Sequence, residues 1–121
     1  MRSISVESLV GITIKEIRYN DYNESIEFTT TEDRSFRMLH DQSCCENVYV
    51  ESIVGDLADL VGEPLLLAEE VSSDDTPPLS DTTESYTWTF YKFATRKGYV
   101  DIRWYGSSNG YYSEGVSLYE Y

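Results

Sequence analysis

Basic residues are scarce in this sequence of 121 residues, which contains 9 Lys and Arg against 22 Asp and Glu and has a formal net charge of −13. Proteins that hold DNA or RNA by bulk charge need a basic surface, so this composition argues against polymeric nucleic acid as a partner. Long apolar runs are also missing: none approaches the roughly 20 residues of a membrane-spanning helix, and the first residues lack the apolar stretch of a signal peptide. We therefore expect a cytoplasmic protein with no membrane partner.

Cysteine and histidine are equally scarce: the chain has 2 Cys and 1 His, and all three lie in the segment His40–Glu46. A structural zinc site needs a second closely spaced pair of ligands, which the sequence does not offer, so we expect no metal and no cofactor. Neighbouring cysteines seldom bond to each other, because the resulting ring is strained. We therefore expect two free thiols, which favours a reducing compartment.

Apolar and aromatic residues, by contrast, are plentiful, at 40% and 14% of the chain. These fractions are too high for a disordered acidic tail. A chain of this length can bury roughly two-thirds of its unfolded surface and normally forms one domain. We therefore expect a single globular domain over residues 1–121.

The acidic residues are concentrated in the middle of the chain. Residues 38–91 contain twelve Asp and Glu and no Lys or Arg, and within them residues 72–84 are predicted to form an exposed acidic loop. Such a stretch can be an ordinary solvated surface, or a face that binds a basic partner or mimics nucleic acid. An anionic ligand would need a local pocket of Arg side chains, backbone N–H groups and aromatic rings.

Alternating apolar and polar residues predict strands in much of the chain. Clear examples are residues 25–29 and the pair 86–91 and 100–105, which flank a tight turn. Residues 56–61 are predicted to form a short helix, because Asp56 can cap it and a glycine follows it. The expected fold is mainly β (α+β), an antiparallel and curled sheet or meander with one or two short helices.

The segment His40–Glu46 carries the densest set of reactive side chains. It can be purely structural, or it can be a polar site in which His40 donates to a ligand or acts as an acid or base, with Asp41 or Glu46 fixing its tautomer. In an enzyme, the catalytic residues would be His40, Cys44 and Glu46, with a Cys–His nucleophile pair as one arrangement. The candidate ligand-binding residues of this segment are His40, Asp41, Cys44, Cys45 and Glu46.

A second candidate site surrounds the turn at residues 106–110, where aromatic rings and short polar side chains gather. Aromatic faces can stack on a nucleobase while Ser and Asn bond to its edge and sugar; the alternative is a plain hairpin with exposed tyrosines. Arg103 can pair with a phosphate or with one of the many acids. The candidate ligand-binding residues here are Trp88, Arg103, Trp104, Tyr105, Ser108, Asn109, Tyr111 and Tyr112.

Several stretches together carry a resemblance to known proteins. They are HDQ-x-CCE at residues 40–46, YTWTFYK at 86–92, IRWYG-x-SNGYYS at 102–113, and two shorter stretches at 55–57 and 68–71. In combination they resemble a small family of uncharacterised phage and prophage proteins, over nearly the whole chain from about residue 8. The resemblance implies a phage-encoded protein in the cytoplasm of a bacterial host, and it implies no established activity.

The leading functional hypothesis follows from that origin by analogy. Small acidic phage proteins without an enzyme signature are often inhibitors of host defence, and some are oligomeric sponges for nucleotide signals. We expect a homo-oligomer that binds and sequesters a small nucleotide-type immune signal, such as a cyclic dinucleotide or a cyclic ADP-ribose-like molecule. The alternatives are an enzyme that cleaves such a signal with His40 and Cys44, an acidic protein-binding inhibitor or DNA mimic, and a structural phage protein.

Overall fold

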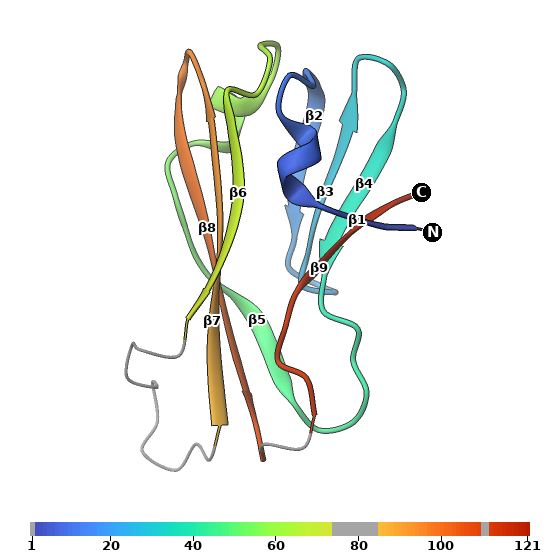
Figure 1. Ribbon diagram of the computed structural model, residues 1–121, viewed down its shortest axis with the longest axis vertical. Coiled ribbons are helices and arrows are strands. Elements are labelled where there is room, and N and C mark those ends of the chain that lie inside the picture. Colours follow the sequence, from blue (N-terminus) through green and yellow to red (C-terminus); the bar gives the residue numbers. More distant parts are fainter. Residues whose placement is uncertain (1, 74–84, 110–111) are drawn as a thin grey trace.

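The strands of the computed structural model form two antiparallel sheets that pack face to face (Figure 1). The structure describes residues 2–73, 85–109 and 112–121. Within these residues the first sheet has the strand order β1-β9-β4-β3-β2 and the second has the order β5-β8-β7-β6. The first sheet contains β1 (Arg2–Ile4), β2 (Ile14–Asn20), β3 (Ser25–Thr30), β4 (Ser35–Leu39) and β9 (Ser117–Glu120). The second contains β5 (Asn47–Val54), β6 (Leu67–Ser73), β7 (Ser85–Thr95) and β8 (Gly98–Ser108).

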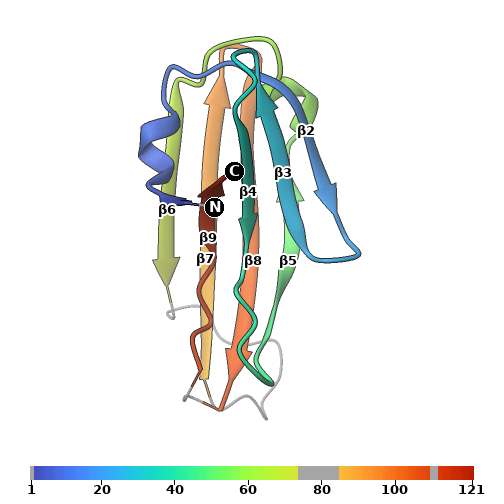
Figure 2. The same cartoon turned by 90° about the vertical axis from the view of Figure 1, so that its right-hand side faces the viewer.

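The mainly β, antiparallel fold predicted from the sequence is confirmed, with two sheets that do not close into a barrel. The predicted short helix at residues 56–61 is a 3₁₀ turn, η2 (Leu57–Leu60), and a second 3₁₀ turn, η1 (Val6–Leu9), lies beside β6 (Figure 2). Asp56 caps η2 as expected, since its Oδ1 accepts a hydrogen bond of 3.0 Å from the Ala58 amide. Of the predicted acidic loop 72–84, residues 74–84 lie outside the described residues.

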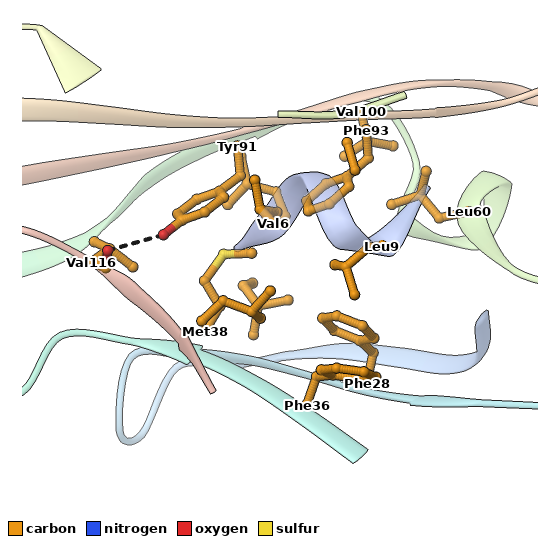
Figure 3. Close-up of a cluster of buried hydrophobic side chains, with 14 of the residues drawn as sticks. Val6, Leu9, Phe28, Phe36, Met38, Leu60, Tyr91, Phe93, Val100 and Val116 are labelled. Atoms are coloured by element: carbon orange, nitrogen blue, oxygen red, sulfur yellow. Dashed lines mark hydrogen bonds between the residues drawn. The ribbon is translucent and has the colours of Figure 1, made fainter. Parts of the chain in front are cut away.

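The core lies between the two sheets and follows the period-2 alternation of the strands. In the first sheet, Phe28 pairs with Phe36, and their rings stack with centroids 5.0 Å apart. In the second sheet, Tyr91 pairs with Ile102 across β7 and β8. Figure 3 shows how Phe28, Phe36 and Met38 from the first sheet face Tyr91, Phe93 and Val100 from the second, with Val6 and Leu9 of η1 between the layers.

Candidate functional site

The hydrogen bonds of the loop that joins β4 to β5 converge on Glu46, whose side chain has no exposed area. Its Oε2 accepts hydrogen bonds from His40 Nε2 (2.9 Å) and from the Ser43 amide (3.0 Å). Its Oε1 accepts from the Cys44 amide (2.8 Å) and from Gln42 Nε2 (3.2 Å). Four donors therefore surround one carboxylate, which holds residues 40–46 in a compact bend.

These hydrogen bonds keep Glu46 ionised. Burial by itself raises the pKa of Glu46, but the hydrogen bonds from the Ser43 and Cys44 amides and from His40 outweigh it and lower the pKa to about 2. A carboxylate with so low a pKa and with its acceptor positions occupied is a poor general base. The geometry therefore assigns Glu46 to holding the loop together.

His40 is held on both sides of its ring, with its side chain 5% exposed. Nδ1 lies 2.6 Å from the carbonyl oxygen of Gly115, and Nε2 lies 2.9 Å from the Glu46 carboxylate. Both neighbours are hydrogen-bond acceptors, so both ring nitrogens are engaged by the protein. A general base needs a bare ring nitrogen, so this arrangement supports a binding or structural role rather than base catalysis.

The two cysteines form a disulfide with each other, so the expectation of two free thiols is wrong. The loop bends around the Glu46 carboxylate, and within that bend the two bonded residues, Cys44 and Cys45, are both exposed. The cysteines therefore give no support to a reducing compartment. Among the residues that the structure describes, no group of three or more His, Cys, Asp or Glu side chains could hold a metal ion.

Asp41 does not take part in this arrangement. It accepts a hydrogen bond from the Tyr119 hydroxyl on β9, and this bond raises the pKa of Tyr119 above its usual value. Of the two acids expected to orient His40, the structure therefore selects Glu46.

A second buried carboxylate, Glu114, joins the segment between β8 and β9 to the second sheet. Glu114 accepts hydrogen bonds from Thr87 Oγ1 (2.8 Å) and from Ser108 Oγ (2.7 Å). Gly106 lets the segment come this close, because a Cβ atom there would lie 2.6 Å from the Glu114 carbonyl oxygen. Since the next residue, Gly115, accepts from His40, the two predicted clusters meet at the lower end of the sandwich in Figure 1. We refer to residues 40–46, 106–109 and 112–116 as the polar end.

The aromatic residues of the predicted ligand site are divided between the two faces of the second sheet. Trp104 faces inward and is 1% exposed within the core. Trp88 and Tyr105 pair on the outer face, with ring centroids 4.8 Å apart, and the Arg103 guanidinium lies 5.7 Å from the centre of the Trp88 ring. Asn109 is exposed and Tyr112 is half-buried at the polar end. Tyr111 lies outside the described residues.

Sequence reasoning missed a groove of about 510 Å³ on the outer face of the first sheet, the face turned toward the viewer in Figure 2. This volume falls in the range of small-ligand pockets, about 300–1,000 Å³. The lining residues are Glu16, Arg18, Glu27, Phe28, Thr29, Ser35, Phe36, Arg37 and Tyr121. One feature of the sequence indicates this face: Glu27 and Arg37 alternate with the core residues Phe28 and Phe36 of the same strands, so their side chains point outward.

Glu27 holds two arginines in place across this groove. Its Oε2 lies 2.7 Å from Arg18 Nη2, and its Oε1 lies 3.1 Å from Arg37 Nε. The Arg37 guanidinium also lies 4.7 Å from the centre of the Tyr121 ring, and Arg37 Nη1 donates to the Tyr121 hydroxyl at 3.2 Å. With Glu16 as the other acid, the formal charges of the lining side chains balance. The groove is therefore locally neutral on a protein of net charge −13.

Acid is expected to destabilise the protein through two carboxylates, Glu46 and Glu120. Hydrogen bonds from Arg34 and then Arg2 lower the pKa of Glu120 to about 2, the same value as for Glu46. Both folded-state values lie below the ordinary value of 4.5, so their stabilisation is complete above pH 4.5 and is lost as the pH falls toward 2. Urea unfolding midpoints measured from pH 7 down to pH 2 check this expectation.

The loss of stability in acid should depend on the Glu46 carboxylate. Glu46→Gln should flatten the fall in the urea midpoint below pH 4.5, whereas the exposed substitution Glu32→Gln should leave it in place. A midpoint that falls equally in both variants would contradict the assignment.

One of three comparisons with known proteins identifies a family. A family model described as "Domain of unknown function (DUF7448)" matches residues 7–118. No curated protein and no solved structure matches the chain. A search for membrane-spanning segments among the described residues finds no helix with the length and apolar character to cross a bilayer.

Proposed function

We propose a function from the residues and geometry of this protein itself. The chain belongs to the DUF7448 family, whose domain is described as one of unknown function, so the family name supplies no activity. The protein is proposed to be a phage-encoded anti-defence protein in the host cytoplasm. It binds and sequesters a small nucleotide-type immune signal, such as a cyclic dinucleotide or a cyclic ADP-ribose-like molecule, as a homo-oligomer. The observation that carries the proposal is the groove, where two arginines and an exposed aromatic ring lie side by side.

Each part of a nucleotide has a matching group in this groove. Guanidinium groups bind phosphate oxygens in paired hydrogen bonds. The Arg18 side chain is 68% exposed, so a phosphate can reach it. The Tyr121 residue is 53% exposed, so its ring can stack on a base. Thr29 and Ser35 add hydroxyls that can bond to ribose or to a base edge. These features support a ligand that combines anionic groups with a planar ring.

Charge separates this proposal from binding to a polymer. A phosphate is repelled at long range by the net charge of −13 but meets a neutral lining at short range. Salt screens the long-range repulsion more than the close contacts. Affinity for a small nucleotide should therefore change little or rise with added salt, whereas a DNA mimic bound to a basic protein would lose affinity steeply.

The groove arginines are expected to account for most of the affinity. Arg37→Ala and Arg18→Ala should each weaken binding of a cyclic dinucleotide or cyclic ADP-ribose-like ligand about 10-fold or more, because a hydrogen bond to a charged group contributes about 1.5–3 kcal/mol. Isothermal titration calorimetry of the purified protein with a panel of these signals measures the effect.

Two control variants locate the site. Arg96→Ala removes an exposed and paired arginine, 2.8 Å from Glu63, that does not line the groove, and should leave affinity unchanged. Arg103→Ala tests the outer face of the second sheet. Equal losses in Arg96→Ala and Arg37→Ala, or no binding of any adenine-containing signal, would contradict the proposal.

Sequestration is distinguished from cleavage by recovering the ligand. Because both His40 ring nitrogens face acceptors and Glu46 is surrounded by donors, we expect the ligand to come back intact when the complex is heated. Recovery of fragments would instead support the enzyme alternative with His40 and Cys44, in which the Cys44 thiol would first have to be released from its disulfide with Cys45 by reduction.

A further inference from the structure

The Cys44–Cys45 disulfide lies in the most exposed part of the polar end. Residues 41–45 are all exposed, and they lie between β4 and β5 rather than within a strand. Thiol–disulfide exchange requires a thiolate to reach one sulfur atom of the pair, and that access is available here. A purely structural disulfide in a domain of this kind would be expected to bridge distant segments, whereas this pair spans a sequence separation of 1.

The backbone around the pair is held by groups other than the sulfur atoms. The Ser43 and Cys44 amides donate to Glu46, and Gln42 Nε2 donates to the carbonyl oxygens of Cys44 (3.1 Å) and Glu46 (2.6 Å). These hydrogen bonds do not require the S–S bond. When the bond is opened, the loop should therefore keep both sulfur atoms close together, so that the ring can form again.

We infer that Cys44 and Cys45 form a reversible thiol–disulfide exchange site, with a dithiol as the reducing co-reactant and Glu46 as the positioning residue. A thiolate of the dithiol attacks one of the two sulfur atoms, a mixed disulfide forms, and the other cysteine leaves as a thiolate that takes up a proton. The second thiolate of the reductant then attacks the reductant's own sulfur in the mixed disulfide, and the bonded protein cysteine leaves as a thiolate that takes up the second proton. The protein gains two electrons and two protons, and the dithiol becomes a cyclic disulfide.

Thiol counting on the folded protein tests the site directly. Protein purified without reductant should show no reactive thiols, and dithiothreitol in native buffer should produce two per chain. Removing dithiothreitol and adding oxidised glutathione should return the count to zero at a rate independent of protein concentration, without disulfide-linked dimers. Resistance to dithiothreitol until the protein is unfolded, or reoxidation into linked dimers, would overturn the inference.

The role of Glu46 has its own readout. Glu46→Gln keeps one acceptor oxygen but replaces the other with an amide nitrogen that faces donors, so the equilibrium constant for ring closure against a glutathione buffer should fall about 10-fold. Glu51→Gln, an exposed substitution on β5, is the matched control and should leave the constant unchanged.

A milder variant keeps this test valid if Glu46→Gln does not fold. Gln42→Ala removes the hydrogen bonds to the Cys44 and Glu46 carbonyl oxygens and should shift the same constant by a smaller factor while far-ultraviolet circular dichroism is unchanged. A constant identical in the wild type, Gln42→Ala and every folded Glu46 variant would contradict the positioning role.

Discussion

Trp104→Ala is expected to lower the free energy of unfolding by about 3–5 kcal/mol, the usual range for removing a large aromatic side chain from a core. The Trp104 residue is 1% exposed and pairs with Thr89 on the inward face of the second sheet. Urea unfolding followed by circular dichroism measures the loss. Tyr22→Ala, at a residue that is 96% exposed, is the control and should change stability by less than about 0.5 kcal/mol.

The same position also distinguishes a core residue from a ligand residue. Trp104→Phe keeps an aromatic ring in the core, so the protein should fold and bind its nucleotide as the wild type does. A marked loss of affinity in a folded Trp104→Phe protein would instead favour the hypothesis that this ring stacks on the ligand.

His40→Ala is expected to cost about 3 kcal/mol, because it removes one hydrogen-bond partner from each of two acceptors at the polar end. One is the buried carboxylate of Glu46 and the other is the carbonyl oxygen of Gly115. Thermal and urea unfolding measure the change in stability. Faster hydrogen exchange at the Ser43 and Cys44 amides should accompany it, since these amides donate to the same carboxylate.

A conservative variant tests how much of the lost stability comes from hydrogen bonding. His40→Gln has an amide that can donate to one acceptor but lacks the two-sided ring, so it should recover only part of the lost stability. Full stability in His40→Ala would show that the bonds to Glu46 and Gly115 do not hold the polar end together.

Local alternation was enough to predict individual strands, whereas Trp104 was expected to bind a ligand and instead lies in the core. Trp104 lies in phase with Val100 and Ile102, and these three residues face the core together. The same alternation placed Glu27 and Arg37 on the outer face of their strands. What alternation cannot supply is which strands pair: Arg37 contacts Tyr121, 84 residues away, because β9 inserts between β1 and β4.

At the polar end, too, contacts between residues close in the sequence could be predicted, whereas contacts between distant segments could not. The clustering of His40 with Glu46 was visible in the sequence, and so was the expectation that an acid would orient the ring. The Gly115 carbonyl and the buried Glu114 come from a segment about 70 residues further along, and only the packing of the two sheets brings them near. The disulfide was not predicted, because the bend around the Glu46 carboxylate depends on backbone hydrogen bonds that leave no sequence pattern.

The central claim is that a small nucleotide binds in the groove of the first sheet, and nuclear magnetic resonance of the labelled protein tests it most directly. On addition of a cyclic dinucleotide or a cyclic ADP-ribose-like ligand that binds in calorimetry, we expect shifts in the Nε–Hε signals of Arg18 and Arg37 and in the amide of Tyr121. The indole signals of Trp88 and Trp104 should stay in place. Shifts confined to Trp88, Tyr105 and the polar end, with the groove signals unmoved, would contradict this account.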